Sequence, residues 1–378
     1  MMLAPARAAY IHVPFCRHRC GYCNFTLIAG RDDLQAAFLQ ALQRELEQLQ
    51  TPRPVDTLFF GGGTPTHLAP NHLQQLLKLA QHWFPPQPNA EISVEANPSD
   101  ITSQKIEILA AAGVNRLSLG VQSFQEQKLQ LLERDHRRDT IHQALARARP
   151  AFASLNLDLI FGTPAETVDS WRADLREALT TPVTHLSTYG LTIELGTTFW
   201  SRHQRGELTR PSDTLERQLY ELAIDELTAA GFEHYEVSNF ARPGFRCRHN
   251  ETYWLGKPYF AAGPGAARYL DGRREVNHRS TTTYLRRLQN GQSPVAEWEE
   301  LEPEDRARER LVFGLRRLAG VHREAFARET GYHIDQLVGR VLPELVQRNL
   351  LRWHNHHLQL TRAGLCVSDA IWPLFLRR

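Results

Sequence analysis

The stretch Ala8-Ala-Tyr-Ile-His-Val-Pro-Phe15 is an apolar segment that leads directly into Cys16-Arg-His-Arg-Cys20-Gly-Tyr-Cys23. Its composition predicts a β-strand at residues 8–15, with the three cysteines in the loop that follows. Five further segments have the length and apolar content of strands, at residues 55–60, 91–96, 116–121, 155–161 and 186–193. Segments with apolar residues at three- and four-residue spacing lie between them and predict helices at residues 34–49, 67–83, 103–112, 140–149 and 170–179.

The alternation of strands and helices is typical of right-handed βαβ units, whose strands form a parallel sheet. Six such units are fewer than the eight of a closed barrel, so we expect an α/β fold with a partial (βα)6 barrel. In barrels of this kind the chemistry lies at the carboxyl ends of the strands. The unusual turns of this sequence follow the strands directly, and we therefore expect the functional site at that edge.

The pattern changes after a long predicted helix at residues 213–230. Residues 232–240 resemble a strand, and residues 243–268 read as a loop rich in glycine, proline and aromatic residues. A small winged-helix-like α+β domain is predicted from helices and alternating stretches at residues 303–318, 323–330, 334–348, 350–361 and 362–375. We therefore divide the chain into a barrel domain at 1–240, a connecting segment at 241–300 and a C-terminal domain at 301–378.

The composition of the 378 residues is that of a globular protein, with 42% hydrophobic and 23% charged residues. The 44 basic and 42 acidic residues nearly balance, so no strong field points to nucleic acid or to a membrane surface. No stretch approaches the roughly 20 apolar residues of a transmembrane span, and no secretory signal is recognisable, so we expect a cytoplasmic location. The five cysteines are an odd number, which does not suit a secreted disulfide framework.

The cysteine loop supplies three thiolates, from Cys16, Cys20 and Cys23. Thiolate is the preferred ligand of iron–sulfur clusters and also binds zinc. A zinc site would need a fourth ligand, for which His12 or His18 are candidates. A 4Fe-4S cluster held by three cysteines instead keeps one iron open for an exchangeable ligand, and the spacing favours this cluster.

The turn Gly61-Gly-Gly-Thr-Pro65 closes the second predicted strand. Glycines allow a ligand to approach the backbone closely, although a tight turn that needs positive φ is the alternative. Together with the cysteine loop, this turn resembles the radical S-adenosylmethionine (SAM) superfamily. In that superfamily the open iron takes the amino and carboxylate groups of SAM, and the glycine-rich turn meets its methionyl end.

Further segments extend the resemblance over nearly the whole chain. They are Tyr10-x-His-x-Pro-Phe-Cys16, Glu95-Ala-Asn-Pro98, Arg116-Leu-Ser-Leu-Gly-Val-Gln-Ser-Phe124, Asn156-Leu-Asp-Leu-Ile-Phe-Gly162, Tyr235-Glu-x-Ser-Asn-Phe-Ala241 and His249-Asn-x-x-Tyr-Trp254. All are similar to one branch of the superfamily, which contains oxygen-independent coproporphyrinogen III dehydrogenases and the shorter haem chaperones called HemW.

The resemblance implies that Cys16, Cys20 and Cys23 are the cluster ligands. The positions that fall where the family contacts SAM are Tyr10, Tyr22, Gly62, Gly63, Thr64, Glu95, Gln122, Arg134 and Asp158. Carboxylates and an amide at the ends of successive strands suit ribose hydroxyls or an ammonium group. Alternatively, the two acids cap helices or pair with Arg134.

Two features separate the branches. The dehydrogenases are longer and carry a fourth cysteine two residues after the third, where this sequence has Phe25. The resemblance implies that His249 is a haem ligand, with Tyr253 and Trp254 covering the macrocycle. The alternative is a histidine that hydrogen-bonds within a turn, beside core aromatics. Cys247 is a candidate second ligand, a candidate attachment point or a small buried hydrophobe.

The resemblance implies a chaperone that binds haem and a SAM-coordinated 4Fe-4S cluster and passes haem to an acceptor protein. The alternative is an oxygen-independent coproporphyrinogen III dehydrogenase. An electron donor is implied only if SAM is cleaved. The basic residues of the C-terminal domain alternate with acids, which argues against nucleic acid as a partner.

Overall fold

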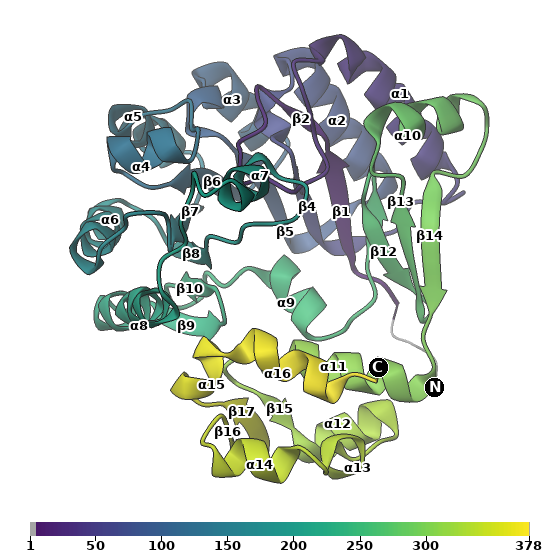
Figure 1. The fold of residues 1–378 in the computed structure, drawn as a ribbon. Helices are drawn as coiled ribbons and strands as arrows, with labels where there is room; N and C mark the ends of the chain where they lie inside the picture. Colours follow the sequence, from purple (N-terminus) through teal and green to yellow (C-terminus); the bar gives the residue numbers. More distant parts are fainter. Residues whose placement is uncertain (1–4, 378) are drawn as a thin grey trace.

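The computed structural model describes residues 5–377, in a large α/β unit and a smaller C-terminal unit (Figure 1). Within these residues the main sheet has nine strands in the order β11-β1-β4-β5-β6-β7-β8-β10-β9. Its six central strands run parallel, each beside the next along the chain, which confirms the predicted partial barrel. They are β1 (Ala8–Val13), β4 (Val55–Gly62), β5 (Pro86–Ala96), β6 (Arg116–Gln122), β7 (Ser154–Phe161) and β8 (His185–Gly190).

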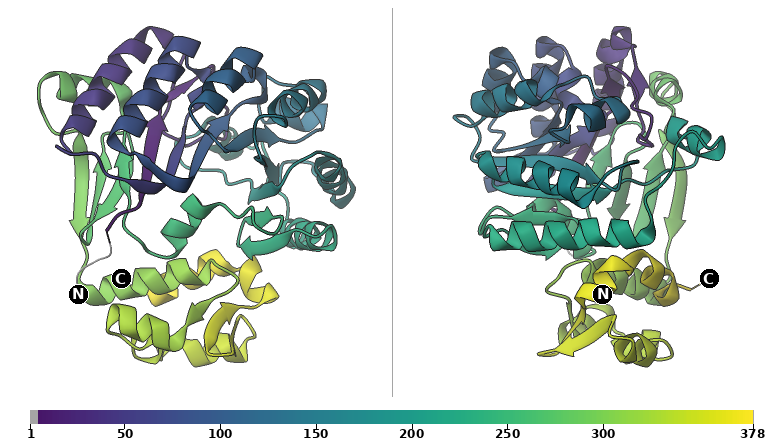
Figure 2. Two further views of the ribbon diagram at one scale, coloured as in Figure 1. Left: turned by 180° about the vertical axis from the view of Figure 1, so that it is seen from behind. Right: turned by 60° about the vertical axis from the view of Figure 1, so that its left-hand side comes forward.

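Helices cover the outer face of this curved sheet (Figures 1 and 2). The main ones are α1 (Gln35–Glu47), α2 (Pro70–Trp83), α3 (Ser103–Ala111), α5 (Arg138–Ala148), α6 (Val168–Thr180) and α8 (Asp213–Ala229). Their apolar faces bury large side chains such as Phe38, Leu77 and Trp171, each contributing roughly 1.5–3 kcal/mol. The indole N–H of Trp171 donates to the carbonyl of Leu219 at 2.9 Å, which ties α6 to α8.

Two short helices after the parallel strands were not predicted, α4 (Glu126–Leu131) and α7 (Thr198–Gln204). Strand β8 also ends at Gly190, three residues before the predicted end. The strand expected at 232–240 is a hairpin of β9 (Glu233–Glu236) and β10 (Asn239–Ala241), and β10 pairs antiparallel with β8. The buried carboxylate of Glu236 accepts the backbone N–H of Ser238 at 3.1 Å, which closes the turn between the two strands.

The prediction of a loop at residues 243–268 is wrong. This region contains α9 (Arg248–Trp254) and β11 (Phe260–Ala262), and β11 adds to the main sheet beside β1. A separate antiparallel sheet follows, made of β12 (Ala267–Leu270), β13 (Arg273–Asn277) and β14 (Val295–Glu300), with α10 (Thr281–Gln289) between its last two strands. Helix α9 is short, and its first N–H groups are bonded by a carboxylate from β5 rather than by a neighbouring residue. The local sequence therefore does not indicate this helix.

The C-terminal unit is α+β, as expected of a winged-helix-like domain. Its sheet has the order β15-β17-β16, from β15 (Val321–His322), β16 (Leu351–His354) and β17 (His357–Leu360). Its helices are α11 (Pro303–Leu315), α12 (Arg323–Thr330), α13 (Ile334–Val338), α14 (Leu342–Gln347), α15 (Arg362–Cys366) and α16 (Ser368–Phe375). No helix in the described part of the chain is long and apolar enough to cross a membrane.

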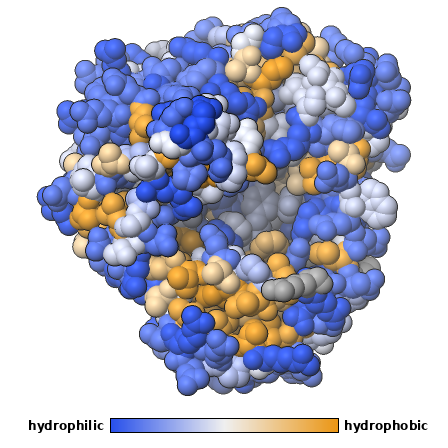
Figure 3. Space-filling view, in the orientation of Figure 1, coloured by the Kyte–Doolittle hydropathy of each residue, from blue (hydrophilic) through white to orange (hydrophobic). Residues whose placement is uncertain are grey.

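Two predicted helices of this unit are each divided in the structure. The helix expected at 334–348 stops after Val338, because Pro343, which lacks an N–H, fits best in the first turn of a new helix. The helix expected at 362–375 breaks at Val367, and the turn there lets Trp372 and Phe375 pack into the core. In Figure 3 apolar side chains gather over the region of α16, below a hollow in this face.

Candidate functional site

A cavity of about 590 Å³ opens at the carboxyl edge of the parallel strands. Its wall contains eleven of the residues proposed from the sequence, which come from the cysteine loop, from four strands and from the segment after α4. They are Cys16, Cys20, Tyr22, Cys23, Gly62, Gly63, Thr64, Glu95, Gln122, Arg134 and Asp158. The topology of the sheet therefore brings together segments that are far apart in the sequence.

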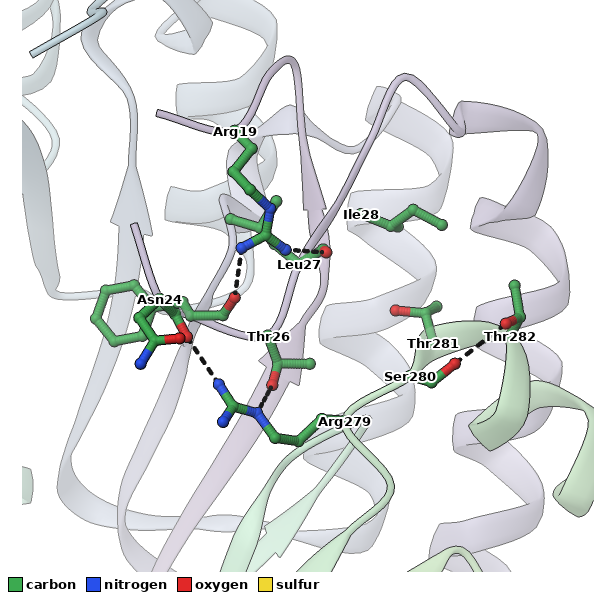
Figure 4. A pocket seen from close by; sticks show the side chains of 10 residues that line it. Arg19, Asn24, Thr26, Leu27, Ile28, Arg279, Ser280, Thr281 and Thr282 are labelled. Atoms are coloured by element: carbon green, nitrogen blue, oxygen red, sulfur yellow. Dashed lines mark hydrogen bonds between the residues drawn. The ribbon is translucent and has the colours of Figure 1, made fainter. Parts of the chain in front are cut away.

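The cysteine loop is held by two arginines. Strand β2 (Phe15–Cys16) pairs with β3 (Ile28–Ala29), which closes the loop at its base. Arg19 donates to the carbonyl oxygens of Cys23 and Leu27, at 3.2 and 2.8 Å. From outside the loop, Arg279 donates to the carbonyl of Asn24 at 2.7 Å and to Oγ1 of Thr26 at 3.2 Å (Figure 4). The backbone around the third cysteine is thus fixed from two sides.

Two of the three thiols contact polar groups of the cavity wall. Sγ of Cys16 is 3.4 Å from the hydroxyl of Thr64, and Arg134 donates to Sγ of Cys20 at 3.4 Å. Burial raises the pKa of Cys16 to about 11 and also raises the pKa of Cys23, so these two thiols are protonated when no metal is bound. A bound metal removes these protons, since a coordinating thiol is deprotonated.

The two histidines considered as fourth zinc ligands both form hydrogen bonds to backbone carbonyl oxygens. Nε2 of His12 is 2.6 Å from the carbonyl oxygen of Thr26, and its Nδ1 is 3.1 Å from the hydroxyl of Tyr10. Nε2 of His18 is hydrogen-bonded to the carbonyl oxygen of Glu133 and also lies 3.5 Å from Sγ of Cys20. The three thiols of the loop are the ligand set that a cluster with one open iron requires.

The glycine turn is required by packing. Gly62 has a φ of 108°, and a Cβ atom there would collide with the ring of His12. Its N–H donates to Oε2 of Glu95 at 3.0 Å, while the N–H of Gly63 donates to the carbonyl of Val13 at 2.8 Å. The N–H groups of Gly62 and Gly63 are thus hydrogen-bonded within the protein, as the alternative of a tight turn implies.

Two polar atoms in the cavity wall have no partner. Within residues 5–377, Oε1 of Gln122 and Nε of Arg134 are buried without a hydrogen bond. Gln122 also has a φ of 70°, a conformation that costs energy outside glycine and is enriched at functional sites. Such groups are satisfied by a polar ligand, and a molecule with amino, carboxylate and hydroxyl groups fits them.

The two acids are held by strands rather than by Arg134, which donates instead to Cys20 and to the carbonyl of Gly120 at 2.8 Å. Asp158 lies inside β7, three residues before its end, and accepts the hydroxyl of Ser118 at 2.9 Å. Burial raises the pKa of Asp158, and burial together with the charge of Asp158 raises that of Glu95 to about 7.

The raised pKa of Glu95 predicts that the effect of Glu95→Gln on the stability of the ligand-free protein depends on pH. The folded state favours the protonated carboxyl of Glu95. The stability that this preference contributes is complete below the ordinary carboxyl pKa and is lost as the pH rises through 7. Glutamine keeps an oxygen for the Gly62 N–H without ionising. Urea unfolding should show the variant gaining ~1–3 kcal/mol over wild type at about pH 8 and little at about pH 5. If the difference in unfolding free energy between variant and wild type were the same at the two pH values, the pKa of Glu95 would not be raised in the folded protein.

Tyr10 and His249 do not line the cavity. Tyr10 packs on Phe59, with ring centroids 6.1 Å apart, and its hydroxyl meets His12. His249 stacks on the same Phe59 at 5.0 Å, and its ring nitrogens bond the hydroxyls of Thr57 and Tyr253. Tyr253 hydrogen-bonds His249, and Trp254 lies under the guanidinium of Arg316, so their role in covering a macrocycle stays a prediction.

Sequence reasoning missed two groups of residues. The cavity is also lined by residues within or just beyond the predicted strands, Asn97, Asp100, Ser118, Gly120, Ile160, Tyr189, Leu191, Thr192 and Glu194. For those that follow a strand, such as Asn97 and Glu194, the position after the strand could have indicated this. Glu91 gave no such signal: it accepts the backbone N–H groups of Arg248 and His249, each at 3.0 Å, and so caps α9 from 157 and 158 residues away.

The fold and the cavity define a class of protein. Residues 10–178 match the model of the Radical SAM superfamily, and residues 301–367 match that of the HemN C-terminal domain. A solved structure described as coproporphyrinogen III oxidase (HemN) from Escherichia coli, a radical SAM enzyme, superposes with a TM-score of 0.86 at 24% identity. The match covers 98% of this chain and 90% of that one, so the fold is the same.

Curated relatives with similar sequences identify the family within the radical SAM superfamily. The "Heme chaperone HemW" of Bacillus subtilis is 35% identical, over 98% of this chain and 99% of that protein. The protein of the same name from Lactococcus lactis is 32% identical, over 99% and 98%. The chain belongs to the HemW family.

Proposed function

We propose that the chain is a haem chaperone, which binds haem at His249, holds a SAM-coordinated 4Fe-4S cluster in the cavity and delivers haem to an acceptor protein. The observation that carries the proposal is the match to heme chaperones along nearly the whole chain. The five cysteines are free thiols, which agrees with a reducing compartment such as the cytoplasm.

In this proposal Cys16, Cys20 and Cys23 ligate the cluster, which supplies an iron with an open coordination position when bound. Other residues of the cavity wall hold SAM. Gln122 and Arg134 offer their unpaired acceptor and donor, and a guanidinium suits a carboxylate. Glu95 on β5 and Asp158 on β7 lie on either side of β6, and their carboxyl groups can bind hydroxyls or an amine.

The dehydrogenase reading is not favoured. Where the dehydrogenases carry a fourth cysteine, this chain has Phe25, which is 67% exposed beside the cysteine loop. The named relatives are also chaperones rather than dehydrogenases.

We expect the reduced, cluster-loaded protein to form no protoporphyrinogen from coproporphyrinogen III in the presence of SAM. The measurement is product formation by chromatography under anaerobic conditions, with a coproporphyrinogen dehydrogenase as positive control. Conversion at about 1 per second, or well below it, would favour the enzyme over the chaperone.

The haem site is tested by His249→Ala. Haem buries a large apolar surface, so most of its affinity comes from the surrounding side chains rather than from the iron–nitrogen bond. The visible spectrum of bound haem should therefore change clearly, with a smaller loss of affinity. His354→Ala, on an exposed strand end of the C-terminal unit, is the control and should keep the wild-type spectrum. An unchanged spectrum in His249→Ala would place the ligand elsewhere, with Cys247 the next candidate.

A further inference from the structure

Three buried polar side chains lie next to Asp158 in the interior of the barrel. Asn156 is two residues before Asp158 on the same face of β7, and its register partner on β8 is His185. The third is Tyr235 on β9. Their exposures are 2%, 1% and 4%, and the wall of the cavity includes Asp158 but none of these three. The proposed site therefore gives them no direct contact with a ligand.

A continuous chain of hydrogen bonds runs through these side chains. The amide nitrogen of Asn156 donates to Oδ1 of Asp158 at 2.9 Å, and its Oδ1 is 2.6 Å from Nδ1 of His185. Nε2 of His185 is 2.8 Å from the hydroxyl of Tyr235, whose oxygen accepts the backbone N–H of Cys247 at 3.2 Å. Cys247 directly precedes α9. The chain thus joins the start of α9 to a carboxylate of the cavity wall.

The chemistry of the groups fixes the direction of this chain. An ionised carboxylate only accepts hydrogen bonds, so the nitrogen of the Asn156 amide faces Asp158 and the oxygen faces His185. That oxygen also only accepts, so Nδ1 of His185 carries the proton. Burial lowers the pKa of His185 well below its ordinary value, so the ring is neutral and its Nε2 accepts the O–H of Tyr235. Each member therefore donates toward Asp158 and accepts on its other side.

We propose that His185 is a positioning residue of the SAM site, which fixes the amide of Asn156 and through it the carboxylate of Asp158. This inference rests on the proposed function, in which Asp158 contacts SAM. The hydroxyl of Ser118 holds the other carboxylate oxygen at 2.9 Å. Both oxygens are thus held by protein donors, and their remaining lone pairs accept from a hydroxyl or amino group of the ligand. If the amide of Asn156 turned over, its oxygen would face the carboxylate and repel it.

The opposite faces of the same strands are apolar. Leu155 and Leu157 on β7 and Leu186 on β8 are fully buried in the hydrophobic core. A buried polar side chain without a partner costs free energy, whereas a fully bonded network makes its members rigid. The polar row on the inner face is thus suited to hold one orientation of a binding group, which apolar packing alone would not do.

The test is the Kd for SAM of the full-length, anaerobically reconstituted protein carrying His185→Leu, measured by equilibrium dialysis. This Kd should rise roughly tenfold, as expected when a hydrogen bond to a charged group is no longer held in place. His185→Gln should recover most of the affinity, because an amide offers both a donor and an acceptor. His234→Leu is the matched control. His234 precedes Tyr235 in β9 but stacks on Phe240 at 4.3 Å, outside the chain, and its loss should leave the Kd at the wild-type value.

A double-mutant cycle with Asp158→Ala shows whether His185 acts through Asp158. Asp158→Ala alone should weaken SAM binding, and adding His185→Leu to it should change the Kd by less than about twofold. Additive effects of the two changes, or a wild-type Kd for His185→Leu, would overturn the inference while the SAM site stands. If Asp158→Ala bound SAM as wild type does, the proposed SAM site would be wrong and the inference would fall with it.

A spectroscopic measurement on the ligand-free wild type does not depend on how well His185→Leu folds. Nitrogen-15 spectra of the histidine side chains should show a proton on Nδ1 of His185 and an unprotonated Nε2. Tyr235→Phe removes the donor to Nε2, so the resonance of Nε2 should move while Nδ1 stays protonated. A proton on Nε2 of His185 in the wild type would show that the chain does not run toward Asp158, and the inference would be wrong.

Discussion

Replacing Cys20 with alanine should abolish the iron–sulfur chromophore of the anaerobically reconstituted protein. Cys20 is the most buried of the three loop cysteines, and Arg134 donates to its sulfur. Its loss leaves two thiols, from Cys16 and Cys23, for a cluster that needs a thiolate on each of three irons. The measurement is iron and acid-labile sulfide per chain after reconstitution.

Cys366→Ala is the matched control for this experiment. Cys366 lies at the end of α15 in the C-terminal unit, with its sulfur 3.9 Å from a carboxylate oxygen of Glu221. The same side-chain change there should leave the iron content at the wild-type level. If Cys20→Ala retained about four irons and four sulfides per chain, the cluster assignment would be wrong.

A buried cluster of three charged side chains is expected to contribute strongly to the stability of the protein. The ammonium group of Lys128 is paired with Glu166 and lies 3.1 Å from Asp174, and the three side chains are at most 7% exposed. Asp174 also accepts the backbone N–H of Phe124 at 2.8 Å, and Glu166 accepts that of Thr163 at 3.0 Å. The lysine is thus the shared counter-ion of two carboxylates, which hold the segments after β6 and β7.

Lys128→Met should therefore destabilise the protein by about 3–5 kcal/mol, because it leaves two buried carboxylates without a counter-ion. Urea unfolding of the cluster-free protein measures this change in free energy of unfolding. Adding Glu166→Gln and Asp174→Asn should restore part of the loss, since it removes the uncompensated charges. Lys78→Met, on the exposed side of α2, should change stability by no more than about 0.5 kcal/mol. A loss below about 1 kcal/mol for Lys128→Met would show that the cluster is not a significant source of stability.

The parallel barrel and most of the cavity were predictable from the sequence. The apolar runs that became β1, β4 and β6 are buried strands, and buried parallel strands carry a strong local signal. Because parallel strands end at one edge, residues that follow them, such as Cys16 and Gln122, had to meet there. The C-terminal unit was also predictable in kind, although a proline and a sharp turn divided two of its helices.

The position of His249 was decided only by the tertiary structure. Its helix is capped by Glu91, and its ring is bonded by Thr57, which lies 192 residues earlier in the chain. The sequence marked Tyr253 as an aromatic neighbour, but not as a hydrogen-bond partner that occupies Nε2. Hydrophobic periodicity and turn residues report the local environment of a segment. A hydrogen bond between distant segments forms only when the sheet has aligned them, and so it leaves no trace in the order of residues around it.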